Sequence, residues 1–234
     1  MSQLRGDDDA AEAMTAAPDR RARRSRRPTV NPGTSLRRGR PGHDISTVLA
    51  TSVDVFNEQG FDGTSIDDLA RRLKITKSAI YHHVRSKEAL LGLALDHALE
   101  GLEKIAQTTR LIDAPAVDRL ETLLRGSVDV LVERLPYVTL LLRVRGNSET
   151  ERQALVRRRR LDRFVADLVE EAVGDGDLRP DIDPAVTARL LFGMVNSLTE
   201  WLRPSHQHSA SRLADAVTMV AFDGLRRSPR AEEG

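Results

Sequence analysis

The segment Thr64–Leu90, TSIDDLARRLKITKSAIYHHVRSKEAL, constrains the fold most, because helix caps and apolar spacing agree along its length. Its first apolar residues follow the i, i+3, i+4, i+7 spacing of a helix with one buried face: Ile66, Leu69, Ala70 and Leu73. Thr64 and Asp67 have the spacing of a capping box, so we expect this helix to begin beside them.

A second helix is expected after a break at Lys74-Ile75, where Thr76 can cap it. Ile80 and Val84 should point inward. The residues that point outward are basic or able to form hydrogen bonds: Lys77, Ser78, Tyr81 and His82. Two short helices with a tight turn and a cationic outer face predict a helix-turn-helix that seats its second helix in the major groove of DNA.

The segment ITKSAIYHHVRSKEALL, residues 75–91, resembles the signature of TetR/AcrR transcriptional repressors. The resemblance implies an all-α fold of about nine helices, with an N-terminal helix-turn-helix domain and a C-terminal domain for effector binding and dimerisation. It implies a homodimer on a palindromic DNA operator, and no enzymatic activity. One departure is Lys74, at a turn position often held by Gly, where a positive φ costs a non-Gly residue roughly 1 kcal/mol.

Helix geometry assigns DNA-binding roles within this segment. Lys77, Ser78 and Tyr81 should face the groove, where Lys77 can donate to guanine. Thr64, His82 and Lys87 should hold backbone phosphates. With the basic arm described below, the predicted DNA-binding set is Arg37, Arg38, Arg40, Thr64, Thr76, Lys77, Ser78, Tyr81, His82 and Lys87.

Residues 1–42 have too few large apolar side chains to offset the entropy of ordering. We expect a disordered arm whose Arg-rich second half enters the minor groove, with a solvated basic tail as the alternative. The expected domains are then the arm at 1–42, the helix-turn-helix domain at 43–90, the helical effector and dimerisation domain at 91–227, and a disordered tail at 228–234.

Apolar residues at helical spacing predict the remaining helices at 44–59, from 87 to about 107, and then near 115–135, 137–145, 149–173, 184–202 and 209–226. No segment alternates as a strand would. The last two helices have broad apolar faces, which favour a four-helix bundle between two subunits. Core helices of a monomer are the alternative.

Few residues suggest catalysis or metal binding. The chain lacks cysteine, a Gly-rich phosphate loop and a nucleophile elbow, so we expect no enzyme and no cofactor. His82 and His83 point about 100° apart on a helix and cannot chelate one metal ion from one face. His206 and His208 lie in a polar loop, where any metal binding would be adventitious. The sequence shows no membrane span or apolar signal, so we expect a cytoplasmic protein.

The family resemblance implies an internal effector pocket in the C-terminal domain. Its candidate lining is Tyr137, Leu141, Arg145, Phe164, Leu168, Phe192 and Asn196, with plain core as the alternative for the apolar members. Arg143, Arg145 and the run Arg157–Arg160 suggest an anionic ligand. Segments 141–151 and 192–204 resemble repressors of fatty-acid, phenylacetate or steroid catabolism, which implies an acyl-CoA effector.

Two other classes of regulator remain open. A drug-efflux regulator would favour acidic and aromatic pocket residues for cationic compounds, and only 3% of this chain is aromatic. A non-specific architectural DNA-binding protein is the second.

Overall fold

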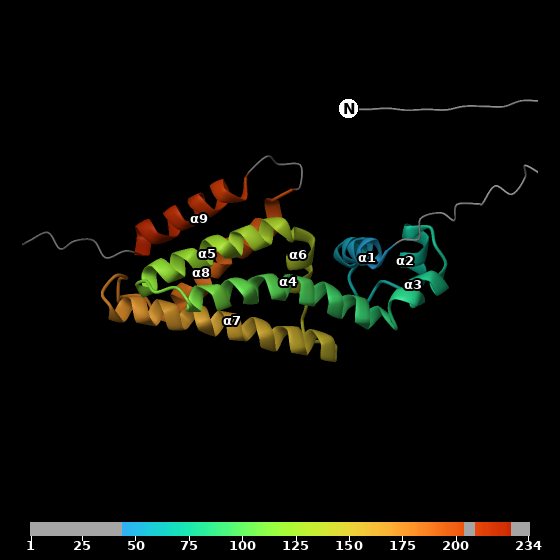
Figure 1. The fold of residues 1–234 in the computed structure, drawn as a ribbon, viewed down its shortest axis with the longest axis horizontal. Helices are drawn as coiled ribbons and strands as arrows, with labels where there is room; N and C mark the ends of the chain where they lie inside the picture. Colours follow the sequence, from blue (N-terminus) through green and yellow to red (C-terminus); the bar gives the residue numbers. More distant parts are fainter. Residues whose placement is uncertain (1–43, 204–208, 226–234) are drawn as a thin grey trace, which may run out of the picture. The chain divides into compact units, whose positions relative to one another are not determined.

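The computed structural model describes residues 44–203 and 209–225. Within these ranges the chain forms nine α-helices and no strand, which confirms the all-α prediction (Figure 1). The helices are α1 Ile45–Gln59, α2 Ile66–Leu73, α3 Lys77–His83, α4 Lys87–Arg110, α5 Ala116–Glu133, α6 Leu135–Arg143, α7 Glu149–Gly174, α8 Pro184–Trp201 and α9 Ala210–Leu225.

Helices α1 to α3 bury one side each in a shared core, to which the start of α4 contributes. The most buried side chains there come from all four helices: Val53, Phe56, Leu69, Ile80 and Leu90. Phe61, in the loop after α1, lies edge-on to Phe56 with ring centroids 5.2 Å apart. The apolar spacing read from the sequence therefore identified the inward faces correctly.

The cap of α2 lies one residue later than predicted. Ser65, not Thr64, is the N-cap, and its capping box is formed with Asp68 instead of Asp67. Both pairs have the required spacing, so the sequence alone could not choose between them. At the other end of α2, Lys74 has φ 57°, which confirms the left-handed turn.

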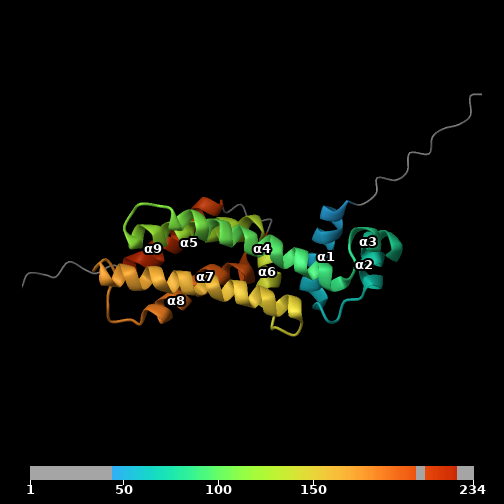
Figure 2. The ribbon, with the colours of Figure 1, turned by 60° about the horizontal axis from the view of Figure 1, so that its bottom comes forward.

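Helices α4 to α9 form the larger part of the described chain. Helix α4 packs against α5, α6 and α7, while α5 packs against α9 and α7 packs against α8 (Figures 1 and 2). Leu95, Leu99, Leu120, Leu124 and Leu168 are among its fully buried side chains. The length of α4 lets one rigid helix contribute to both this core and the core around α1 to α3.

Helix α6 begins two residues earlier than predicted. It runs from Leu135 to Arg143, and Pro136 sits in its first turn. Proline is tolerated there because the first helical N–H groups have no acceptor within the helix. Pro136 thus belongs to the first turn of α6 and does not lie between two helices.

Several sequence predictions fall outside the described residues. These are the basic arm with Arg37, Arg38 and Arg40, the loop with His206 and His208, and the tail at 228–234. Across the described helices, none combines the length and apolar character required to span a membrane.

Candidate functional site

Helix α3 presents a polar face to solvent. Ile80 is fully buried against α2, whereas the side chains on the opposite side are exposed. Tyr81 has 52% of its surface exposed although it is aromatic, and no core contact explains it. The exposed residues of α3 are the predicted Lys77, Ser78, Tyr81 and His82, together with His83. Thr76 caps α3, accepting a hydrogen bond from the Ala79 amide at 3.2 Å.

Lys77 pairs with Asp67 of α2. The Lys77 Nζ and Asp67 Oδ2 atoms lie 2.7 Å apart, and about half of each side chain is exposed. The hydrogen bond to Asp67 raises the pKa of the Lys77 ammonium. The pair holds the ammonium on the outer side of the helix-turn-helix, and it costs little to open because water solvates both groups.

The side chains of Lys87 and Thr64 form hydrogen bonds with backbone carbonyls of the protein. The Lys87 ammonium donates to the carbonyls of Phe61 and Thr64, both at 2.8 Å, and lies 4.3 Å from the centroid of the Phe61 ring. Thr64 is 2% exposed and its hydroxyl donates to the Gly60 carbonyl at 2.7 Å. In this conformation the Thr64 hydroxyl cannot reach a phosphate, and only one Lys87 hydrogen remains for such a contact.

The histidines of α3 are both exposed. Among the residues that the structure describes, no group of three or more His, Cys, Asp or Glu side chains is arranged to hold a metal ion.

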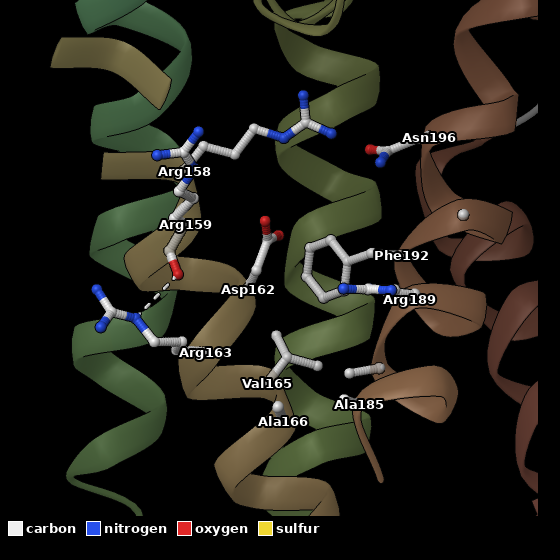
Figure 3. Close-up of a pocket in the computed structure, with 12 residues that line it drawn as sticks. Arg158, Arg159, Asp162, Arg163, Val165, Ala166, Ala185, Arg189, Phe192 and Asn196 are labelled. Atoms are coloured by element: carbon white, nitrogen blue, oxygen red, sulfur yellow. Dashed lines mark hydrogen bonds between the residues drawn. The ribbon is translucent and has the colours of Figure 1, made fainter. Parts of the chain in front are cut away.

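A second candidate site is a cavity of about 690 Å³ between α7 and α8, here called the outer cavity (Figure 3). Its lining includes Arg158, Arg159 and Arg163 from α7 and Arg189 from α8. Opposing these four cations is one carboxylate, Asp162. The outer cavity is therefore strongly cationic.

The outer cavity adjoins a smaller inner cavity among α4, α5, α6, α7 and α8. Both cavities are lined by Arg158, Asp162, Phe192 and Asn196. The rest of the inner lining is almost entirely apolar: Leu102, Ser127, Leu131, Val138, Leu141, Leu142, Leu161 and Val195. Its volume, about 30 Å³, is too small for an acyl chain without movement of the surrounding helices.

The structure brings together only part of the predicted effector set. Leu141, Phe192 and Asn196 line the inner cavity, and Phe164 lines a small adjoining cavity with Phe192. The other predicted members are elsewhere. The Tyr137 ring lies tilted against that of His97, with centroids 4.4 Å apart. Leu168 is 1% exposed in the core, and Arg145 is exposed and lines a groove next to the α1–α2 loop.

Of the predicted cationic run, Arg158 and Arg159 line the outer cavity but Arg157 does not. Arg157 binds Glu103 and Asp96 of α4, with both Glu103 contacts at 2.8 Å. Arg143 donates to the Asn57 carbonyl of α1. Sequence reasoning missed Asp162, Arg163 and Arg189, because only the packing of α7 on α8 brings them together.

Helices α8 and α9 carry large apolar side chains that the described chain leaves exposed. They are Val186, Leu190 and Trp201 on α8, and Met219 and Val220 on α9. Val220 is 70% exposed and Met219 63%. We call these five side chains together the apolar patch of α8 and α9. Large apolar side chains left exposed in this number are typical of a protein–protein interface.

Helix α6 connects the inner cavity to α1. Leu141 and Leu142 line the cavity from α6. At the other side of α6, the Asn57 side chain donates to the Pro136 carbonyl at 2.8 Å and Arg143 donates to the Asn57 carbonyl at 2.5 Å. A movement of α6 would therefore also displace α1 through these two hydrogen bonds.

Two family models match the chain. Residues 48–94 match the model of bacterial regulatory proteins of the tetR family, and residues 113–225 match a tetracyclin repressor-like C-terminal domain. The first match contains α2 and α3, and the second contains α5 to α9.

Individual proteins agree with these matches. SCO3833 of Streptomyces coelicolor, a TetR-family member of known structure, is 47% identical, with a TM-score of 0.71 over 77% of this chain and 92% of that one. The repressor KstR2 of Mycolicibacterium smegmatis is 22% identical over 80% of this chain and 93% of its own. AibR, solved with isovaleryl coenzyme A and operator DNA, is 26% identical, with a TM-score of 0.64 over 76% and 97% of the two chains.

Proposed function

The chain belongs to the TetR family of DNA-binding transcriptional regulators, and from this premise we propose that it is a repressor that binds a palindromic operator as a homodimer. We further propose that an acyl-CoA thioester releases it from that operator. The first proposal rests on α3 and on the apolar patch of α8 and α9. The second rests on the outer cavity having a cationic lining and the adjoining inner cavity an apolar one.

The exposed face of α3 supports its role as the DNA-reading helix. Tyr81 is held in solvent by the same helix that buries Ile80, so a binding surface explains it better than packing does. Lys77 stands beside it with its ammonium paired to Asp67, and can exchange that partner for guanine O6 or N7. The roles of Ser78, His82 and Thr76 stay proposals of the same kind.

The apolar patch of α8 and α9 supports a dimer with two-fold symmetry. Two such patches in contact would bury side chains that one subunit leaves in water, and two-fold symmetry brings the same surface to both sides. A two-fold dimer presents its α3 helices to half-sites separated by whole turns of DNA.

The observation that carries the effector proposal is the change from a cationic lining in the outer cavity to an apolar lining in the inner cavity, two cavities that share four lining residues. Four arginines suit phosphates, which accept paired hydrogen bonds from guanidinium groups. The apolar inner cavity suits an acyl chain. A fatty acid, with a single carboxylate, would leave most of this positive charge unused, and a cationic drug would be repelled by it. AibR, whose structure contains isovaleryl coenzyme A, supports the same class.

The narrowness of the inner cavity supports a release mechanism. An acyl chain must push apart Leu141 and Leu142 of α6 from the facing helices. Because α6 is hydrogen-bonded to α1 through Asn57, the displacement would reach the helix-turn-helix. Ligand binding and operator binding would then favour different positions of α6, which is the requirement for coupling two sites.

The proposed function is tested by selecting bound duplexes from a random pool with the purified full-length protein. We expect enrichment of a palindrome, followed by release when acetyl-, octanoyl- or palmitoyl-CoA is added. Free CoA is the control for the acyl chain. No enrichment over random competitor at moderate salt would overturn the repressor proposal, and enrichment without release by any of the three thioesters would overturn the effector class alone.

A further inference from the structure

The two cavities meet at a neck, defined by the residues that line both: Arg158, Asp162, Phe192 and Asn196 (Figure 3). Arginines lie on its outer side and leucines and valines on its inner side. A ligand with an anionic end outside and an apolar end inside must pass its connecting part through the neck. The neck would therefore contact the part of the ligand that connects its anionic end to its apolar end.

Asp162 is the one carboxylate among the lining residues. No arginine of the described chain lies within 4.0 Å of it as an ion-pair partner, although Arg158 and Arg189 act on it from farther away. Partial desolvation outweighs these two arginines and raises the pKa of the Asp162 carboxyl. Its oxygens are thus free to accept hydrogen bonds from a ligand.

A carboxylate at this point affects ligands unequally. It weakens the attraction for any anion, but most for a ligand that carries its negative charge at the neck. A free fatty acid with its chain in the inner cavity would place its carboxylate there. An acyl-CoA thioester would place the amide N–H groups of its pantetheine arm near the neck and its phosphates near the outer arginines.

We infer that Asp162 is a specificity-determining residue, which accepts hydrogen bonds from a neutral, amide-bearing arm and rejects ligands with a carboxylate at the neck. The inference rests on the proposed effector class. Arg158 attracts the anions of both ligands, so among the charged residues of the neck it is Asp162 that distinguishes between them. The repulsive element serves selectivity at some expense of affinity.

The test compares Asp162→Asn with Asp167→Asn in the full-length protein. The first substitution removes the charge and keeps the shape. The second makes the same change on the same helix at a position that is exposed, as Asp162 is, but lines none of these cavities. Calorimetry measures the Kd values for octanoyl-CoA and octanoate. Relative to wild type, the ratio of octanoate Kd to octanoyl-CoA Kd should fall roughly tenfold in Asp162→Asn, which corresponds to about 1.4 kcal/mol, because the like charge that repels the octanoate carboxylate is removed. It should stay constant in Asp167→Asn.

Asp162→Glu, which keeps the charge, should keep the selectivity and separates the charge from any loss of folding. If the wild type binds octanoyl-CoA and Asp162→Asn has the same Kd ratio as Asp167→Asn, the role of Asp162 is overturned while the effector class stands. If the wild type binds none of acetyl-, octanoyl- and palmitoyl-CoA, the effector class is overturned and the role of Asp162 with it.

Discussion

At the scale of single residues, Lys74 allows the steric cost of a positive φ to be measured at a position outside the exposed face of α3. It is the one non-Gly residue with positive φ in the described chain, at the C-cap of α2. Lys74→Gly removes the steric cost of that conformation and should raise the free energy of unfolding by roughly 1 kcal/mol, with operator affinity unchanged. Thermal unfolding measures the gain. A lower melting temperature would mean that the lysine side chain stabilises the turn by more than its φ costs.

Lys87 is the residue where the structure adds most to the sequence-based prediction. Its ammonium ties down the loop between α1 and α2 through Phe61 and Thr64. Lys87→Met should lower the free energy of unfolding by roughly 1–3 kcal/mol, since two carbonyls lose a charged donor. Arg85→Met, at an exposed neighbour, is the control.

The salt dependence of operator binding separates the two roles proposed for Lys87. If it only positions the loop, Lys87→Met weakens binding but leaves the slope of log K against log salt unchanged. A decrease in the slope by about one would instead establish the phosphate contact predicted from the sequence.

At the scale of helices, the buried face of each helix could be predicted from its apolar spacing, whereas contacts between residues far apart in the sequence could not. The inward faces of α2 and α3 follow from apolar spacing, because each face is set within one helix. The start of α2 at Ser65 depends on which of two equally spaced pairs forms the box. The partners of Arg157, in contrast, lie on α4, more than fifty residues away, and no local signal points to them.

Arg157 joins α7 to α4 through its ion pairs with Glu103 and Asp96. Removing Arg157 should reduce the stability of the protein most near neutral pH. Arg157→Met should lower the free energy of unfolding by roughly 1–2 kcal/mol. The hydrogen bond from Arg157 lowers the pKa of Glu103 below its ordinary 4.5, so the stabilisation is present above that value and is lost as pH falls through the folded-state pKa. Urea unfolding from neutral to acidic pH should show the difference between wild type and variant shrinking. Arg159→Met, at an exposed position of α7 that does not act on Glu103, should behave as wild type.

At the scale of the whole molecule, the candidate effector site combines what the sequence indicates with what only the packing of helices reveals. Phe192 and Asn196, which the sequence predicts for an effector pocket, line the inner cavity. Arg189 and Asp162 were not expected, because each is an ordinary charged residue on its own helix. They become candidates for ligand binding only because α7 and α8 pack together and leave a cavity that both residues line.

The apolar patch of α8 and α9 gives the prediction that concerns the complete assembly. Leu190→Asp with Val220→Asp places two carboxylates where the proposed dimer would exclude water, and burying them unpaired costs more than the interface can supply. We expect the variant to sediment as a folded monomer. Because a monomer engages only one half-site at a time, its operator affinity should fall by roughly a hundredfold or more.

Leu111→Asp is the matched control, since Leu111 is 86% exposed, lies directly after α4 and belongs to neither α8 nor α9. It should leave both the sedimentation coefficient and the operator affinity unchanged. A double variant that still sediments as a dimer would assign the interface to another surface. A monomeric double variant with undiminished operator affinity would instead show that a single α3 helix is enough for recognition, and the palindrome would lose its physical basis.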